Sequence, residues 1–156
     1  DWANMNRQAG AMASTIGRPK IEVMANQVRD INPTVTLELM PNGLTEDNID
    51  HFLKDADIYV DSLDIFALNI RRKVFNRCGE LGIPAVTAAP MGMGTSVLAF
   101  MPGHMSFEEY FAFDGHSFED QILKFIVGVS PSMIQRHYLL NRESVNLFKK
   151  SLEICV

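Results

Sequence analysis

The chain has 156 residues, a formal net charge of −5 at pH 7, and hydrophobic residues at 47% of its length. This length fits one domain with a substantial core, and the composition is ordinary for a soluble globular protein. The acidic balance argues against a protein that coats nucleic acid, and no run of about 18 apolar residues is present to span a membrane.

Helices and strands alternate in the first part of the chain. Apolar residues at helical spacing predict helices at 17–31, after Thr45, and at 67–81. Strands are predicted at 34–39, 57–61 and 85–89. The first of these strands should be half-buried, whereas the continuous apolar centres of the other two are typical of strands covered on both faces. The alternation indicates a mostly parallel sheet with right-handed crossovers.

The pattern changes after Gly94. A strand at 95–101 follows without an intervening helix, so we expect it to run antiparallel to its neighbour. Further helices are predicted at 106–111, 118–127 and 132–140. The fold class is therefore α/β: a Rossmann-like, mostly parallel sheet with an antiparallel extension and a helical C-terminal part. The aromatic-rich stretch 107–118 should form core or a subunit interface, because the basic partners of a base-stacking platform are missing.

Polar side chains gather before and at the start of the first helix: Asn4, Arg7, Gln8 and Lys20. Backbone amides at a helix start favour phosphate. Arginine offers a bidentate fork and lysine a point charge, which suits the oxygens of a β,γ-diphosphate. The pair is weak by itself, since a lysine such as Lys20 is more often a surface residue.

Carboxylates follow the 57–61 strand, at the end of a parallel strand where ligands bind. Asp61 or Asp64 could hold magnesium, which prefers oxygen ligands and often uses one or two protein carboxylates beside phosphate. Asp64 could equally cap the helix that follows. Gly92 and Gly94 could allow close backbone approach to a ligand or only form the turn between strands.

The other ionisable side chains indicate no further chemistry. The basic run Arg71-Arg72-Lys73 is expected on the solvated side of its helix. No metal spacing is shown by the histidines, His51, His104, His116 and His137. Cys78 is expected to be a buried, inert thiol, and with Cys155 it builds no disulfide framework or four-cysteine zinc site. The expected compartment is the reducing cytoplasm.

Five short motifs occur in the order and spacing of the ThiF/MoeB superfamily, which includes the adenylation domains of ubiquitin-activating enzymes. The motifs are Asn4-x-Asn6-Arg7-Gln8, Gly17-Arg18-Pro19-Lys20, Ile31-Asn32-Pro33, Asp57-x-x-x-Asp61-x-x-Asp64 and Cys78-x-x-x-Gly82-Ile83-Pro84. The resemblance covers roughly residues 4–101. From Met105 onward the chain is similar to a less characterised bacterial branch of ThiF-like proteins.

The resemblance implies ATP-dependent adenylation of a carboxylate with release of pyrophosphate. The carboxylate would usually be the C-terminus of a ubiquitin-like or sulfur-carrier protein, and it could also belong to a peptide or to a modified tRNA nucleoside, although the acidic composition argues mildly against tRNA. ATP and magnesium would be required. It implies that contacts to the nucleotide come from Asn4, Arg7, Gln8, Lys20 and Leu63. It also implies that Arg7, Lys20 and Asp64 are catalytic, that Asp64 holds the magnesium ion, and that the protein is a homodimer.

The chain departs from the family pattern at its amino end. The Gly-rich loop and the ribose-binding acid should precede Asn4 and are absent, and Ile65 replaces a frequent asparagine. We therefore expect a single, amino-terminally truncated ThiF-like domain, 1–156, with an α/β portion at 1–101 and a helical, aromatic-rich portion at 102–156. This chain itself should bind ATP poorly, whereas the full-length protein should be an active enzyme.

Two other functions remain open at this stage. One is a non-catalytic ThiF-like binding or scaffold domain, and the other is a dinucleotide-dependent oxidoreductase, which would leave Arg7, Lys20 and Asp64 without a purpose. The adenylation hypothesis predicts that these three side chains converge on one cleft at the carboxyl edge of the sheet. It also predicts self-association through the aromatic stretch.

Overall fold

The computed structural model describes residues 2–5, 8–91 and 94–132, and these divide at Gly43 into two compact units. We call residues up to Gly43 the amino-terminal unit and those from Leu44 onward the sheet unit. Each is described by itself. Among the helices of the described residues, none is long and apolar enough to cross a membrane.

The amino-terminal unit contains a short 3-10 helix, η1 (Trp2–Asn4), and the helix α1 (Lys20–Ile31). α1 begins later than the predicted 17–31 because Gly17 adopts the left-handed conformation, with φ +83°. The helix ends at Asn32, where the chain becomes extended before Pro33. Val23 and Ala25 are the buried residues of the helix.

The predicted strand at 34–39 is wrong, because no hydrogen-bonded strand forms there in the described structure. The alternation that suggested it is present, with Val35 and Leu37 half-buried and their neighbours exposed. Alternation reports which side chains are covered, but a strand also needs a second strand to share a hydrogen-bond ladder. None of the described segments pairs with this one.

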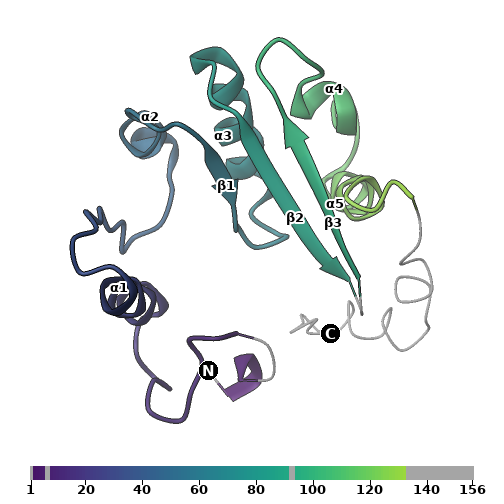
Figure 1. Cartoon of the computed structure of the whole chain (residues 1–156). Helices are drawn as coiled ribbons and strands as arrows, with labels where there is room; N and C mark the ends of the chain where they lie inside the picture. Colours follow the sequence, from purple (N-terminus) through teal and green to yellow (C-terminus); the bar gives the residue numbers. More distant parts are fainter. Residues whose placement is uncertain (1, 6–7, 92–93, 133–156) are drawn as a thin grey trace. The chain divides into compact units, whose positions relative to one another are not determined.

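The sheet unit has a three-stranded sheet: β1 (Tyr59–Asp61), β2 (Ala85–Met91) and β3 (Gly94–Phe100), in the order β1-β2-β3 (Figure 1). β1 and β2 are parallel, whereas β2 and β3 are antiparallel. The crossover between the parallel strands is made by the helix α3 (Leu68–Leu81). The α/β class and the antiparallel extension are therefore confirmed, and the arrangement agrees with a Rossmann-like fold.

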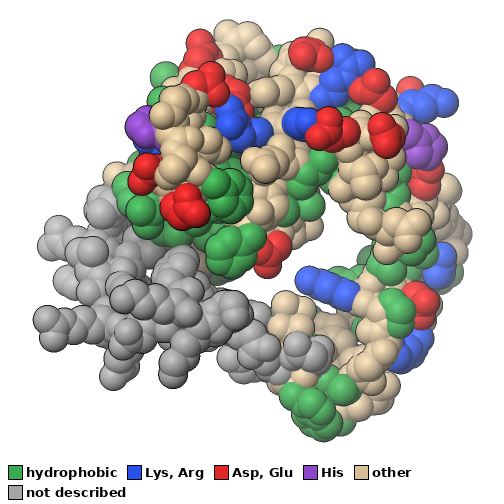
Figure 2. Space-filling view, turned by 180° about the vertical axis from the view of Figure 1, so that it is seen from behind, with side chains coloured by type: hydrophobic (Ala, Val, Ile, Leu, Met, Phe, Trp, Pro, Cys, Tyr) green, Lys and Arg blue, Asp and Glu red, His purple; other side chains and the backbone are tan. Residues whose placement is uncertain are grey.

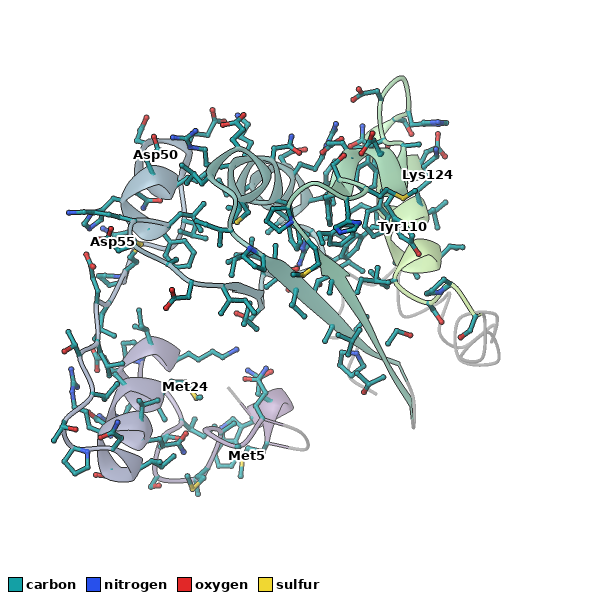
Figure 3. The ribbon with its side chains drawn as sticks, turned by 45° about the horizontal axis from the view of Figure 1, so that its top comes forward. Met5, Met24, Asp50, Asp55, Tyr110 and Lys124 are labelled. Atoms are coloured by element: carbon teal, nitrogen blue, oxygen red, sulfur yellow. The ribbon has the colours of Figure 1, made fainter. Side chains whose placement is uncertain are left out.

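Short helices complete the sheet unit: η2 (Glu46–Asn48), α2 (Ile49–Phe52), α4 (Phe107–Phe111) and α5 (Phe118–Gly128). Ser106 caps α4, and Ser117 caps α5, each by accepting a backbone N–H three residues on. Two further bonds tie α4 and α5 together: Tyr110 donates to the carbonyl of Gly128 at 2.9 Å, and Lys124 donates to that of Ala112 at 2.7 Å (Figure 3). The predicted helix at 132–140 lies outside the described residues from 133 onward.

Aromatic side chains form the core between α3, β3, α4 and α5. The rings of Phe75 and Phe107 stack with centroids 4.2 Å apart, and those of Phe111 and Phe113 stack at 5.1 Å. Phe107, Phe111 and Phe113 are buried. Most of the aromatic stretch is therefore core, whereas Phe118 at its end is 41% exposed, so the aromatic content is no argument by itself for self-association. A dimer remains a prediction without that support.

One face of the sheet is not covered by other described elements of the sheet unit, and the prediction of strands covered on both faces stays a prediction. Tyr59 and Asp61 of β1 are buried, but Val60 between them is 66% exposed. On β3, Val97 is 63% exposed and shares that face through its partner on β2, Ala88. A continuous apolar run identifies a strand, but local sequence cannot say what lies on each side of it.

Charged side chains on the helices of the sheet unit are mixed in sign (Figure 2). Arg77 of α3 bonds to Asp50 of α2 at 2.6 Å and to Glu80 at 2.7 Å, and Lys73 pairs with Glu46. Exposed pairs of this kind contribute little to stability. Lys73, the last residue of the basic run 71–73, is exposed to solvent, as predicted.

Candidate functional site

A cavity of about 260 Å³ in the amino-terminal unit brings together three of the predicted nucleotide contacts, Asn4, Gln8 and Lys20. Arg18 also lines it, so two cations border one hollow. Met24 of α1, labelled in Figure 3, lies on its apolar side. Arg7, the fourth predicted contact of this segment, lies outside the described residues.

Short-range backbone bonds shape this cavity. The N–H of Gln8 donates to the carbonyl of Asn4 at 2.9 Å, and the N–H of Ala11 donates to that of Gln8 at 2.9 Å. The hydroxyl of Thr15 then donates to the carbonyl of Gly10 at 2.6 Å and accepts from the N–H of Met12 at 2.9 Å. The loop before α1 is thereby folded back on itself, which places Gln8 and Lys20 on the same cavity.

Gly10 lets this loop lie close against α1. A Cβ at this position would stand 3.1 Å from the sulfur of Met24 and 3.4 Å from a methyl group of Val23. The missing side chain therefore permits a contact that a larger residue would have to push apart. The cavity follows from local sequence: a tight loop, a glycine, and the start of a helix.

The electrostatics of the cavity favour an anion. Lys20 is the first residue of α1, and Arg18 lies two residues before it. The positive end of a helix and two neighbouring cations attract phosphate or carboxylate groups. Gln8 and Asn4 add amide side chains that can donate hydrogen bonds to the same oxygens.

Asp61, at the end of β1, is a structural carboxylate in this molecule. Its Oδ2 accepts from Nε of Arg71 at 2.7 Å and from the hydroxyl of Thr87 at 2.8 Å. Its Oδ1 accepts from the hydroxyl of Tyr59 at 3.2 Å and from the N–H of Leu63 at 3.1 Å. With both oxygens hydrogen-bonded and the side chain buried, Asp61 is a poor metal ligand. Of the two carboxylates predicted as magnesium ligands after this strand, Asp64 is therefore the remaining candidate.

Arg71 corrects the prediction that the whole basic run is solvated. It is 2% exposed and forms a buried ion pair with Asp61, while Arg72 is partly buried and Lys73 is exposed. The signal that could have found it is its spacing. Arg71 follows Leu68 by three residues and precedes Phe75 by four, so it occupies the buried stripe of the helix.

Asp64 makes a turn just before α3. Its Oδ1 accepts from the N–H of Phe66 at 2.9 Å, and the N-cap of the helix is Ala67. The capping alternative is therefore observed as an Asx turn rather than as a cap of the first helical turn. The side chain is exposed, and its Oδ2 has no hydrogen-bond partner within the described part of the chain. That oxygen is free to bind a cation.

Leu63, the other predicted contact in the sheet unit, is fixed through its backbone. Its N–H donates to Asp61, and its carbonyl accepts from Nη2 of Arg71. Asn4, Gln8 and Lys20 thus share a cavity in one unit, and Leu63 and Asp64 are neighbours at the carboxyl end of β1 in the other. That the two groups meet in one cleft remains a prediction.

Burial shifts two side-chain pKa values in the sheet unit. Burial, and then the adjacent Asp61 carboxylate, raise the pKa of Tyr59. Burial raises the pKa of the Cys78 thiol to about 11. Cys78 is therefore the buried and inert thiol that its position predicts.

Within the described residues, no group of three or more histidine, cysteine, aspartate or glutamate side chains could hold a metal ion by itself. His51, His104 and His116 are exposed, and His137 lies outside the described residues. Magnesium beside a nucleotide needs no such group, because phosphate and water supply most of its ligands.

A protein-family model described as the ThiF family matches residues 1–139. HesA from Leptolyngbya boryana is 33% identical over 101 residues, which cover 64% of this chain and 35% of that protein. The sulfur carrier protein ThiS adenylyltransferase of Escherichia coli K12 is 27% identical over 100 residues, covering 64% of this chain and 39% of that protein.

A third relative is the tRNA threonylcarbamoyladenosine dehydratase of Bacillus subtilis 168. It is 29% identical over 89 residues, which cover 56% of this chain and 34% of that protein. The chain spans between 34% and 39% of the length of these three curated relatives.

Proposed function

Because this chain belongs to the ThiF family, we propose that the full-length protein adenylates a carboxylate with ATP and magnesium and releases pyrophosphate. The observation that carries the proposal is the cavity that gathers Asn4, Gln8 and Lys20 at the start of α1. A relative that bears the name of an adenylyltransferase supports the reaction class.

The reaction needs positioning and charge neutralisation more than it needs a protein nucleophile. A carboxylate oxygen of the substrate attacks the α-phosphorus of ATP, and the bond between that phosphorus and the bridging oxygen of pyrophosphate breaks. The products are an acyl adenylate and pyrophosphate. Lys20, with Arg7, balances the negative charge that moves onto the leaving pyrophosphate, and the amides of Asn4 and Gln8 orient the phosphate chain.

Asp64 is the residue that suits magnesium. It offers an exposed carboxylate oxygen, and magnesium takes one or two carboxylates together with phosphate oxygens and water. When bound, the ion would neutralise phosphate charge and draw electron density from the reacting phosphorus. Leu63, held at both backbone groups, places Asp64 at the end of β1.

The substrate in this proposal is the C-terminal carboxylate of a ubiquitin-like or sulfur-carrier protein, or of a peptide, and the protein acts as a homodimer. The carrier-protein substrate is supported by one relative, which is named as an adenylyltransferase of the sulfur carrier protein ThiS. The acidic composition of this chain argues mildly against the alternative carboxylate, a modified tRNA nucleoside, although another relative is named for its action on tRNA.

The test is carried out on the full-length protein. Titration calorimetry with MgATP measures nucleotide binding directly, and ATP–pyrophosphate exchange measures adenylation, with glycine-terminated peptides and carrier proteins as carboxylate donors. We expect MgATP binding and exchange that depends on the added carboxylate. A protein that binds neither ATP nor NAD would instead be the scaffold, and binding of NAD without ATP would indicate the oxidoreductase.

A further inference from the structure

A buried network joins the end of β1 to α3 around the residue that precedes Asp64. Asp61 and Arg71 form its centre, with Thr87 from β2 and Tyr59 from β1 as the neutral donors. Thr87 stands directly opposite Asp61 in the parallel register of the two strands. The network thus joins side chains from β1, β2 and α3.

The guanidinium of Arg71 makes two contacts that no other side chain could make together. Nε donates to Oδ2 of Asp61, and Nη2 donates to the carbonyl oxygen of Leu63. Its central carbon lies 4.6 Å from the ring centre of Phe125. A lysine could reach one of the two oxygens, but it lacks the planar fork that reaches both.

The third nitrogen of Arg71 argues that this fork serves a purpose beyond packing. Nη1 is buried and has no hydrogen-bond partner. A buried donor without a partner is destabilising, and an apolar side chain would avoid that penalty only by leaving the buried Asp61 carboxylate without its counter-ion. The two hydrogen bonds that Arg71 makes, to Asp61 and to Leu63, must therefore offset the cost of this buried, unpaired N–H group.

We propose that Arg71 is a positioning residue for the loop 61–66, which presents Asp64 to its cation; this inference rests on the proposed function. Leu63 is held at its N–H by Asp61 and at its carbonyl by Arg71. Asp64 is then held by its turn with Phe66, which uses Oδ1 and leaves Oδ2 of the exposed side chain without a hydrogen-bond partner among the described residues. Arg71 therefore acts on the metal site through the backbone of Leu63, without touching the reacting atoms.

The neighbouring Arg72 is a natural control with the same chemistry and a different target. It pairs with Glu108 through two bonds of 2.7 and 2.6 Å and lies 5.2 Å from the ring centre of Phe113. Its other bonds go to Asp114 and Gln121. Arg72 thus joins α3 to α4, α5 and the loop between them, and none of its hydrogen bonds reaches the loop 61–66.

The experiment compares Arg71→Lys with Arg72→Lys in the full-length protein. Hydrogen–deuterium exchange reports the amides of residues 62–66, pyrophosphate exchange gives kcat and the magnesium dependence, and thermal unfolding gives stability. For Arg71→Lys we expect faster amide exchange in this loop and a kcat lowered on the order of 100-fold, since a small misplacement of a catalytic group can cost that much. Arg72→Lys should lower the melting temperature while leaving the loop and kcat unchanged.

Amide exchange in the loop decides the inference separately from the activity. If the wild type shows no pyrophosphate exchange, the proposed function fails, and loop exchange in Arg71→Lys still supports or overturns positioning. The inference is overturned if the loop amides of Arg71→Lys exchange no faster than those of Arg72→Lys. It is also overturned if the wild type is active and Arg71→Lys keeps a normal kcat although its loop amides exchange faster.

A milder variant keeps the inference testable if Arg71→Lys does not fold. Thr87→Val preserves shape and removes one of the two bonds to Oδ2 of Asp61. It should give a smaller rise in loop exchange, in the same direction. No rise at all in a folded Thr87→Val protein would count against the network as the device that fixes the loop.

Discussion

The two parts of the chain that carry predicted site residues are built in opposite ways. The cavity around Lys20 is made by backbone turns within a short stretch of chain, and its cations border open space. The end of β1 is made by side chains from β1, β2 and α3, which meet in a buried network. In the second part, the buried network that stabilises the fold also holds the loop that carries the exposed Asp64.

The largest expected effect is on the buried side of this comparison. Asp61→Ala leaves the guanidinium of Arg71 buried without its counter-ion, which should cost about 3–5 kcal/mol of unfolding free energy. Urea denaturation of the variant measures this loss. The matched control is Asp50→Ala, which removes an exposed carboxylate whose partner Arg77 is half-buried and keeps its bond to Glu80, and its midpoint should hardly move. Equal losses in the two variants would show that burial of the Asp61 pair is not what matters.

A second prediction concerns the exposed side. Lys20→Gln should weaken MgATP binding about 10- to 100-fold, because a hydrogen bond to a charged group is worth about 1.5–3 kcal/mol. Its unfolding free energy should change by less than about 0.5 kcal/mol, as for most surface substitutions. Calorimetry and urea denaturation give the two values. Lys54→Gln, an exposed lysine in the turn after α2, should change neither; an equal loss of binding there would point to general charge instead.

A smaller effect is expected from alkaline pH on the buried core. The pKa of Cys78 is raised to about 11 in the folded protein, so the unfolded chain releases this proton at lower pH than the folded one. The stabilisation is complete below pH about 8.5, the pKa of a free thiol, and is lost as the pH rises toward 11. Unfolding midpoints measured over this window should fall less steeply in Cys78→Ala. A slope identical to that of the wild type would show that other groups, such as Tyr59, govern the alkaline limit.

Local patterns predicted most of the helices and strands because those elements are set by nearby residues. Gly82, in the left-handed conformation after α3, ends the helix where the Gly-Ile-Pro sequence indicated. The antiparallel β3 followed from the absence of a helix between it and β2. Pairing is different: the segment 34–39 has the pattern of a strand and no described partner. The elements that cover a strand are not a local property either, since the apolar run that contains Val60 does not say what lies on each side of it.

The predicted site residues show the same difference between local and long-range contacts. Asn4, Gln8 and Lys20 meet because a short loop folds back, which is a local property. Arg71 was misjudged because three successive basic residues suggest a solvated surface, although its helical spacing placed it inward. Asp61 looked like a free carboxylate because its partners Arg71 and Thr87 lie 10 and 26 residues away in sequence.

Asp64→Asn in the full-length protein tests the central claim most directly. Asparagine can make the same turn with the N–H of Phe66, so the unfolding free energy should stay close to that of the wild type. A neutral amide oxygen holds magnesium poorly against water, so pyrophosphate exchange should fall by a factor on the order of 100 or more, or about 3 kcal/mol of transition-state stabilisation. Near-normal exchange in a stable Asp64→Asn protein would contradict the account, because Asp64 would then serve only the turn before α3.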